Sequence, residues 1–297
     1  MQNLNYFSLP QKFRDLSLEK KSLKEVQKEY KFQFKIFTFV NHSLVFKNNE
    51  VFFIENIIQK KFLHKKLVFL GKNRNTLYYC TSISQQVYKR ESVFKATIKL
   101  DVRDSLKFLN SFSSAIVTYG YSIIDWHRSN SYCGKCGFKA SFIQKEKSIK
   151  CLNDKCKNKI FPRLNPTVIM SIFYKNKILL ARNKNWPDKL YSCLAGFCEN
   201  NESAEEAVKR ETLEETNLKI HNIEYKYSQA WPFSNNLMLG FTATSKSKTL
   251  KINEEEIEDA KWFSQQELKD LVKKKLIMLP SKFAIARYLI DHWRSDI

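Results

Sequence analysis

Glycine is scarce in this sequence, with six residues among 297. Because glycine is retained where the backbone needs unusual torsion angles or close approach, these positions are useful markers. Long apolar runs are also missing: the richest stretches, residues 36–40 and 167–174, fall well short of the roughly 20 residues that span a membrane. The first ten residues lack the basic and then apolar segments of a secretory signal. We therefore expect neither a membrane-spanning nor a secreted protein.

Acidic residues are outnumbered, with 30 Asp and Glu against 51 Lys and Arg, a formal net charge of +21. The excess is diffuse, because residues 1–130 hold 22 basic and 10 acidic side chains and the remainder holds 29 and 20. Such a charge is compatible with a nucleic-acid partner. However, Lys, Asn, Ile and Phe are abundant together, a pattern that biased genome composition also produces. We interpret most of the excess as solvated surface lysine.

The length exceeds that of an average domain, and 43% of the residues are hydrophobic, which is enough for two cores and a small module. No internal repeat and no low-complexity linker divides the chain. The first hundred residues contain no motif that carries chemistry. There the pattern predicts a helix near Leu16–Tyr30, strands near 32–40, 44–46, 51–54 and 67–70, and helices within 101–127.

Seven cysteines, an odd number with four in two tight pairs, suggest a reducing compartment and a metal. Cys133, Cys136, Cys151 and Cys156 have the spacing C-x2-C-x14-C-x4-C, close to a zinc ribbon. Four thiolates fill a tetrahedral site, so we predict one structural Zn2+ per chain. His127 precedes a set that is already complete, and we expect it to be structural. The other three cysteines, Cys80, Cys193 and Cys198, are expected to be ordinary apolar positions.

The strongest signal is the segment from Gly196 to Leu218. Ser203 and Glu206 form a capping-box pattern, and Asn217 tolerates the left-handed conformation that ends a helix, so we predict a helix between them. On it, Glu211, Glu214 and Glu215 are spaced i, i+3 and i+4 and project from one face. Such crowding of carboxylates favours Mg2+ or Mn2+. Glu202 and Arg210 are spaced to brace the preceding loop against this helix.

This segment resembles the Nudix box, G-x5-E-x7-R-E-U-x-E-E-x-G-U, in which U is usually a bulky apolar residue. Thr212 is a mild departure from it, and Asn217 replaces the last glycine. The segment 228–241 resembles the S-Q-P-W-P-F-P-x-S sequence of the NADH pyrophosphatase (NudC) subgroup, with departures at Ala230, Ser234 and Asn236. That subgroup also has a four-cysteine ribbon, an A-G-F segment like 195–197 and an acidic E-x-x-x-A-x-W like 256–262. The resemblance covers residues 126–288.

The resemblance implies an α/β (α+β) fold: an N-terminal Nudix-like domain over 1–128, a zinc ribbon over 129–160, and a catalytic α/β/α sandwich over 161–297. It implies a homodimeric hydrolase that splits NADH or NAD+ into nicotinamide mononucleotide and AMP. By the same resemblance, Glu211, Glu215, Glu256 and the Ala195 carbonyl hold Mg2+ or Mn2+, and Glu214 is a base or orients the water. The residues implied to bind the dinucleotide are Phe161 and Phe197 as a stacking clamp, with Gln229, Ala230, Trp231, Pro232, Phe233, Ser234, Asn235, Asn236 and Ala286.

Two alternatives stay open on sequence grounds. One is removal of the NAD cap from the 5′ end of RNA by cleavage of the same bond, which the basic surface would assist. The other is a catalytically silent zinc-ribbon protein that binds nucleotides or RNA, against which the intact Glu211, Glu214 and Glu215 argue. Residues 294–297 at the carboxyl end do not match a peroxisomal targeting signal, and we expect a cytoplasmic protein.

Overall fold

The computed structural model describes residues 7–21, 25–26, 32–55, 67–144 and 146–295, and the chain divides into two compact units. Among the described residues, one unit comprises 164–231 and 236–295, and the other comprises those between 7 and 163 together with 232–235. Among the described helices, none is long and apolar enough to cross a membrane. The predicted helix at Leu16–Tyr30 and the carboxyl end at 294–297 fall partly outside the described residues.

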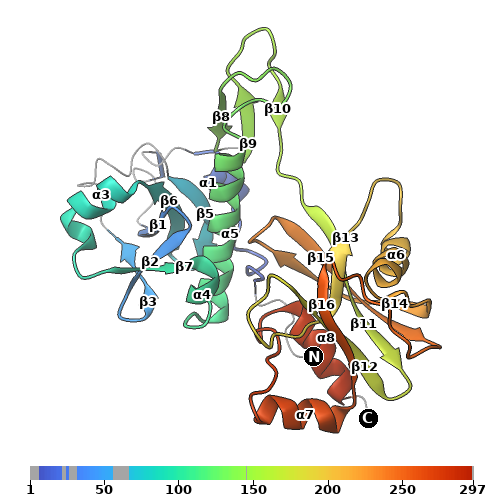
Figure 1. The fold of residues 1–297 in the computed structure, drawn as a ribbon. Helices are drawn as coiled ribbons and strands as arrows, with labels where there is room; N and C mark the ends of the chain where they lie inside the picture. Colours follow the sequence, from blue (N-terminus) through green and yellow to red (C-terminus); the bar gives the residue numbers. More distant parts are fainter. Residues whose placement is uncertain (1–6, 22–24, 27–31, 56–66, 145, 296–297) are drawn as a thin grey trace. The chain divides into compact units, whose positions relative to one another are not determined.

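The unit that contains the acidic segment is built on a six-stranded sheet of order β14-β15-β11-β12-β16, with β13 paired to β11 (Figure 1). Only β11 and β15 run parallel within it, and the other pairs are antiparallel. Its elements are β11 (Asn165–Tyr174), β12 (Lys177–Asn183), β13 (Leu194–Phe197), α6 (Ala204–Thr216), β14 (Ile220–Trp231), β15 (Asn236–Ser245), β16 (Ile257–Phe263), α7 (Gln265–Lys273) and α8 (Ile285–Ser295).

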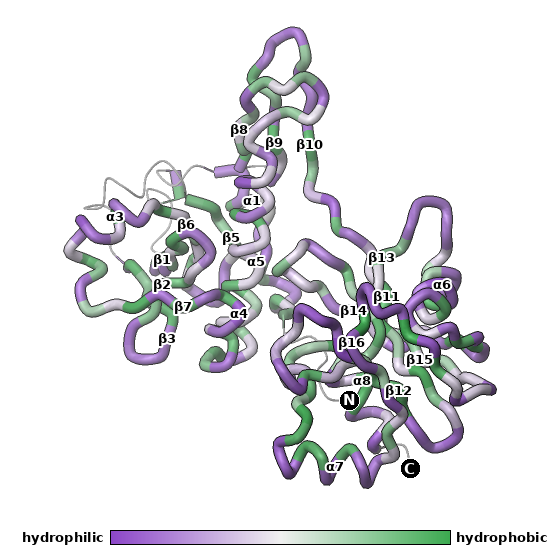
Figure 2. Tube along the Cα trace, viewed as in Figure 1, coloured by the Kyte–Doolittle hydropathy of each residue, from purple (hydrophilic) through white to green (hydrophobic). Residues whose placement is uncertain are grey.

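Both faces of this sheet are covered because β11 alternates its apolar side chains between them. Val168 and Met170 pack with Ala207 and Val208 of α6. The intervening Ile169 joins the opposite core, to which α7 and α8 contribute residues such as Leu268 and Leu289. Hydropathy alternates along α7, as expected of a helix with one buried face (Figure 2). The expected mixed α/β fold is confirmed.

The other unit contains a seven-stranded sheet, β3-β2-β1-β6-β5 with β4 on β1 and β7 on β2. Its long helix α5 begins after Asn110, whose side chain accepts a hydrogen bond from Ser113 N. At Gly120 of this helix a Cβ atom would come within 2.9 Å of the Cys80 sulfur, so glycine permits close packing on β6. The elements are α1 (Leu16–Glu19), β1 (Gln33–Val40), β2 (Ser43–Lys47), β3 (Glu50–Val51), β4 (Phe53–Ile54), β5 (Val68–Asn73), β6 (Thr76–Ile83), α3 (Gln85–Arg90), η2 (Ser92–Phe94), β7 (Ile98–Asp101), α4 (Val102–Ser105) and α5 (Ser111–Ser129).

The four predicted strand segments before residue 101 and the helices within 101–127 are confirmed by these bounds. After α5 the chain forms a three-stranded antiparallel sheet of order β10-β9-β8 (Figure 1). The first cysteine pair precedes this sheet, and the second lies at the end of β9 and between β9 and β10. Its strands are β8 (Ala140–Ile143), β9 (Ser148–Cys151) and β10 (Lys159–Ile160). We call residues 129–160 the ribbon.

A buried ion pair connects the ribbon to the amino-terminal part of the same unit. Lys147, between β8 and β9, donates to Glu19 Oε1 at 2.8 Å and to the Tyr119 hydroxyl at 2.6 Å. Arg14 donates to Glu19 through Nε at 3.1 Å. Burial by itself would raise the pKa of Glu19, but the hydrogen bonds from Arg14 and Lys147 hold this pKa below its ordinary value. Glu19 is therefore a paired carboxylate inside the fold.

Candidate active site and metal centre

The acidic helix α6 forms where the sequence predicts it. Ser203 Oγ accepts a hydrogen bond from Glu206 N, and the Glu206 carboxylate accepts one from Ser203 N, which completes the capping box. Asn217 ends the helix in the left-handed conformation with φ of 57°. Thr212 replaces an apolar residue at a fully buried position, where its hydroxyl donates to Val208 O at 2.7 Å. Both departures from the motif are therefore accommodated by the helix.

Arg210 holds the loop before the helix, as predicted. Its guanidinium makes two hydrogen bonds to Glu202, of 3.1 and 2.6 Å, and a third to Phe197 O at 2.8 Å. The same side chain donates to Glu211 Oε1 at 2.9 Å and to Glu214 Oε2 at 3.0 Å. One cation thus fixes the loop and two of the three clustered carboxylates, and bidentate Arg–carboxylate geometry makes this brace specific.

Gly196 leaves the space that the Glu211 carboxylate occupies. A Cβ atom at Gly196 would lie 1.8 Å from Glu211 Cδ, so any side chain at this position would displace the Glu211 carboxylate. Gly196 lies in β13 opposite Val168 of β11, and its neighbour Ala195 lies opposite Ile169. Ala195 therefore directly precedes, in β13, the glycine whose backbone lies against the Glu211 carboxylate.

Glu215 is the most buried of the three carboxylates, with 7% of its surface exposed. Its Oε2 atom is buried and has no hydrogen-bond partner among the described residues. Burial, followed by the charges of Glu211, Glu256 and Glu214, raises the pKa of Glu215 to about 8. Burial also raises the pKa of Glu211, with Arg210 opposing and Glu214 and Glu256 adding to the rise. An uncompensated buried carboxylate of this kind requires a proton or a cation.

The turn that presents Glu256 is organised by Asn253, a residue that the sequence analysis did not identify. Asn253 N donates to Glu215 O at 3.0 Å, at the end of α6. The Asn253 side chain accepts from Glu255 N at 3.1 Å, and its carbonyl accepts from Glu256 N at 3.2 Å. The sequence signal that could have identified Asn253 is an Asx turn, in which the Asn side chain accepts a hydrogen bond from the backbone N–H two residues later. This turn brings Glu256 into the electrostatic environment of Glu211 and Glu215.

These donors fit a divalent cation. Carboxylate oxygens and a backbone carbonyl are the hard ligands that Mg2+ and Mn2+ prefer. The buried Oε2 of Glu215 is an unused acceptor, and a cation beside it would remove the charge repulsion that raises its pKa. Glu214 differs from the others, because more than half of its side chain is exposed and its described partner is Arg210. The assignment of roles among these residues stays a prediction.

The predicted dinucleotide residues surround the end of β14 and the start of β15. Gln229 is buried, and its amide donates to Phe283 O at 2.8 Å and accepts from Ile285 N at 2.9 Å. Trp231 stacks on Phe283 with ring centroids 6.3 Å apart. Both ends of the Gln229 side chain are thus engaged in positioning the start of α8, where Ala286 is buried in the core.

The turn between these strands carries the remaining predicted residues. Ala230 and Ser234 are exposed, Phe233 and Asn235 are half-buried, and Pro232 is buried. At the start of β15, Asn236 is 7% exposed and its Oδ1 atom has no hydrogen-bond partner in the described part of the chain. Residues 232–235 are grouped with the second unit. The pocket stays a prediction, with Asn236 Oδ1 as its available acceptor.

The two rings of the predicted clamp are exposed. Phe161 has 53% of its surface exposed and Phe197 has 55%, unusual values for phenylalanine. They belong to different units, Phe161 to the second and Phe197 to the first. Exposed rings are available for stacking, and the clamp itself stays a prediction.

The four ribbon cysteines form a compact cluster of sulfur atoms. Cys133 Sγ lies 3.9 Å from Cys156 Sγ, and Cys136 Sγ lies 3.5 Å from Cys151 Sγ. Tetrahedral zinc with Zn–S bonds of about 2.3 Å separates its sulfurs by about 3.8 Å. Among the described residues, this is the one set of three or more Cys, His, Asp or Glu side chains whose ligand atoms all lie within 4.8 Å of one another. The cluster could therefore hold a metal ion.

Hydrogen bonds around the cluster favour the thiolate at one cysteine. The Asn158 side chain donates to Cys133 Sγ at 3.5 Å and, with backbone donors, lowers the pKa of Cys133 to about 6. Burial raises the pKa of Cys151 to about 12. His127 packs on Phe142 with ring centroids 5.1 Å apart, in agreement with a structural role. Cys80 and Cys193 are buried, as expected, and Cys198 is half-buried.

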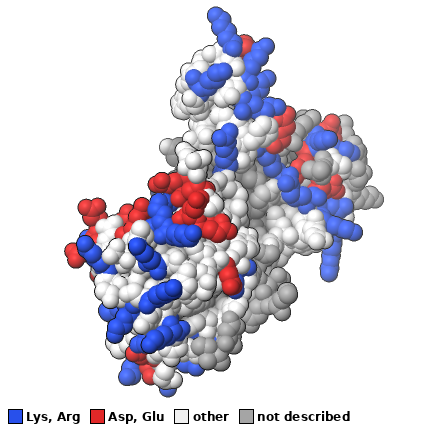
Figure 3. Space-filling model, turned by 90° about the vertical axis from the view of Figure 1, so that its right-hand side faces the viewer, with Lys and Arg blue, Asp and Glu red and all other residues white. Residues whose placement is uncertain are grey.

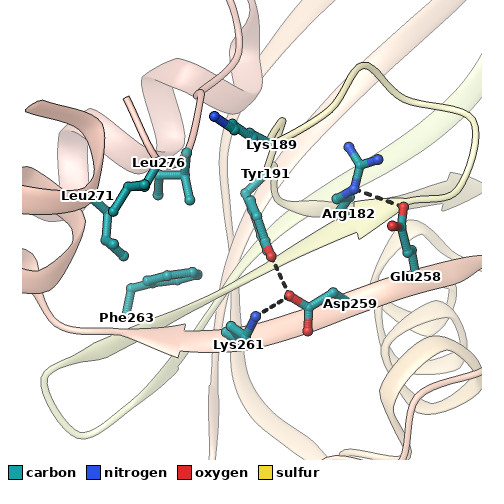
Figure 4. Close-up of a pocket in the computed structure, with 10 residues that line it drawn as sticks. Arg182, Lys189, Tyr191, Glu258, Asp259, Lys261, Phe263, Leu271 and Leu276 are labelled. Atoms are coloured by element: carbon teal, nitrogen blue, oxygen red, sulfur yellow. Dashed lines mark hydrogen bonds and ion pairs between the residues drawn. The ribbon is translucent and has the colours of Figure 1, made fainter. Parts of the chain in front are cut away.

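A cavity of about 440 Å3 lies between β12, β16 and α7, and none of the predicted site residues lines it. Four of its charged residues form two ion pairs (Figure 4): Asp259 accepts from Lys261 and also from the Tyr191 hydroxyl, and Arg182 contacts Glu258 at 2.8 Å. Such pairing is typical of a surface ion-pair network. We assign no ligand to this cavity.

Comparison with known proteins identifies a NUDIX domain over residues 163–282. The chain is 34% identical over 196 residues to NAD-capped RNA hydrolase NUDT12 of Homo sapiens, covering 62% of this chain and 42% of that protein. It is 38% identical over 178 residues to NAD-capped RNA hydrolase NudC of Pseudomonas syringae, covering 60% of each. The chain thus spans less than two thirds of the length of these relatives. A NUDIX hydrolase structure from Nitrosomonas europaea matches 50% of this chain and 97% of its own, with a TM-score of 0.41 and 22% identity.

Proposed function

We propose that the chain, which matches a NUDIX domain over residues 163–282, is a Nudix hydrolase that cleaves the diphosphate linkage of NADH or NAD+. The observation that supports this proposal most strongly is the group of Glu211, Glu215 and Glu256. In this group the buried Oε2 atom of Glu215 has no hydrogen-bond partner among the described residues. Water would attack one phosphorus atom, the P–O–P bond would break, and AMP and nicotinamide mononucleotide, in its reduced form when the substrate is NADH, would leave.

Glu211, Glu215, Glu256 and the Ala195 carbonyl are the groups that would hold Mg2+ or Mn2+. A divalent cation there supplies charge neutralisation for the diphosphate and a lower pKa for a bound water. Glu214, exposed and oriented by Arg210, would accept the proton of the attacking water or orient that water. Arg210 acts as a positioning residue, because its contacts are to carboxylates and to Phe197 O.

The same bond occurs at the 5′ end of NAD-capped RNA, and the names of the two relatives favour this as a second substrate. Cleavage would release nicotinamide mononucleotide and leave a 5′-monophosphate on the RNA. The silent-binder alternative is disfavoured because the carboxylates, the brace and the glycine contact are all present in the fold.

One experiment tests this proposal: product analysis after incubating the pure protein with Mg2+ or Mn2+ and NADH, FAD, diadenosine polyphosphates or NAD-capped RNA. We expect AMP and reduced nicotinamide mononucleotide from NADH, because hydrolysis leaves the oxidation state of the nicotinamide unchanged. Glu215→Gln should abolish product, whereas Glu205→Gln, a control at an exposed glutamate on the same helix, should not. Wild-type protein that leaves both NADH and capped RNA intact would overturn the proposal.

We further infer that the ribbon cysteines hold one structural Zn2+ and that the protein is a homodimer, as the family resemblance implies. The sulfur separations near 3.8 Å support the zinc assignment. Metal analysis of the purified protein should give one zinc per chain. Light scattering should give a mass of twice 35.2 kDa, and a mass of one chain would contradict the dimer.

A further inference from the structure

The ribbon sheet presents one exposed face whose composition follows from the strand register. Ser141 lies opposite Lys150, and Lys150 lies opposite Lys159, so the three form one row across the sheet. In the next row, Tyr132 lies opposite Lys139, whose carbonyl accepts from Leu152 N at 3.0 Å. Side chains two residues apart on a strand share a face, so both rows belong to the same one. We call these six residues the outer face: Tyr132, Lys139, Ser141, Lys150, Leu152 and Lys159.

The opposite face of the ribbon sheet is packed against its own unit. Phe142 contacts His127 of α5, and Ile149 is fully buried. All six residues of the outer face are exposed, including Tyr132 at 62% and Leu152 at 53%. The sheet therefore has one structural face and one face directed to solvent.

The charge of the ribbon is strongly one-sided. Residues 129–160 contain eight lysines against Glu146 and Asp154. Figure 3 shows Lys and Arg side chains gathered over the ribbon, with few acidic ones among them. Glu146 contacts Lys159 at 2.6 Å, and Lys139 and Lys150 extend the positive surface beyond this pair. Even with four thiolates around a zinc ion, the ribbon stays net positive.

We propose that the outer face binds single-stranded RNA, with phosphates on Lys139 and Lys150 and a base stacked on Tyr132. The chemistry favours this ligand because each nucleotide supplies both a flat base for a ring and a phosphate for an ammonium group. The inference rests on the proposed function, since it identifies the part of a capped RNA that lies beyond the dinucleotide. It adds a second contact region to an enzyme whose reaction needs the cap alone.

The chain connects the ribbon to the catalytic sheet by a short segment. Residues 161–164 alone separate the end of β10 from the start of β11, whose register partners include Gly196. The ribbon is thus tethered to the catalytic sheet by four residues, and these include the exposed Phe161.

The test measures binding of an uncapped 20-nucleotide single-stranded RNA to the full-length protein by fluorescence anisotropy. The double variant Lys139→Gln/Lys150→Gln should bind at least tenfold more weakly, and its log–log salt slope should fall by about 1.4, for two lost phosphate contacts. The matched control Lys47→Gln/Lys89→Gln removes the same charge from exposed positions elsewhere in the unit and should change affinity less than twofold. Tyr132→Ala should cost at least fivefold and Tyr132→Phe almost nothing.

Zinc content and melting temperature of each variant establish that the ribbon is folded, and NADH turnover should be unchanged in all of them. Equal RNA affinity in the ribbon and control variants would overturn the inference. It would also be overturned if the ribbon double variant lost binding to phosphatidylserine vesicles while its RNA affinity stayed unchanged, because the outer face would then bind a membrane surface. Because the RNA is uncapped, the measurement does not depend on hydrolysis. Protein that binds RNA through the outer face but cleaves no NADH or capped RNA would contradict the proposed function alone.

Discussion

The carboxylate of Glu211 occupies the space into which any side chain at Gly196 would project, with Cδ 1.8 Å from the position of a Cβ atom. The glycine of the motif is therefore explained by a contact with a predicted metal ligand. Flexibility is not the reason, because this residue lies within β13.

Gly196→Ala should lower NADH turnover by about 100-fold or more, because displacing Glu211 by about 1 Å disrupts the arrangement of the ligands. Gly134→Ala is the control, since a Cβ there meets nothing within 4 Å. Steady-state kinetics checks both. Wild-type turnover in Gly196→Ala would show that Glu211 can move without loss of function.

Without divalent cations at the carboxylates, the free energy of unfolding should fall as the pH rises from about 5 to 8. The pKa of Glu215 is about 8 in the folded protein, above its ordinary value, so the folded state binds more protons in this interval. The slope contributed by Glu215 is at most about 1.4 kcal/mol per pH unit. Urea unfolding in Mg2+-free buffer that leaves zinc in place measures it.

Glu215→Gln supplies the comparison for that measurement. The variant should show a shallower pH dependence than the wild type, and it should be inactive with either Mg2+ or Mn2+. Identical slopes for the two proteins would mean that Glu215 does not carry the extra proton.

Cys133→Ser should release the ribbon metal and lower the melting temperature, because four thiolates and an ion replace a hydrophobic core in so small a module. Metal analysis and calorimetry measure the two effects. Cys80→Ser is a poor control, since Cys80 is fully buried, and Cys198→Ser at a half-buried position is preferable. A metal-free wild type with normal melting of Cys133→Ser would remove the metal site.

Phe161→Ala or Phe197→Ala should raise KM for NADH more than it lowers kcat. Stacking on a ring remote from the diphosphate is mostly uniform binding, worth about 1 to 3 kcal/mol. Both rings are more than half exposed, so neither substitution should cost much stability. Unchanged KM in both variants would remove the clamp.

Local features of the site were predictable from the sequence. The capping box at Ser203, the left-handed Asn217 and the Glu202–Arg210 brace involve residues within one helix and its preceding loop, where spacing determines geometry. The cysteine pairs are equally local, since two short loops present them.

Non-local features were not predictable in the same way. The role of Asn253 depends on its contact with the end of α6, and the engagement of Gln229 depends on the segment before α8, more than 50 residues away. The outer face of the ribbon depends on strand register, because a shift by one residue would direct Lys150 to the opposite side. Tertiary pairing decides such features.

The ion pair between Glu19 and Lys147 joins residues 128 positions apart in the sequence. A contact of such long range closes a large loop, whose entropic cost must be met before the pair contributes stability. The ribbon and the amino-terminal segment therefore stabilise one another only after both have come together in the folded unit. If the Glu19–Lys147 contact is already formed in the transition state for folding, Glu19→Gln should slow refolding. If the contact forms later, the substitution should instead accelerate unfolding of the protein.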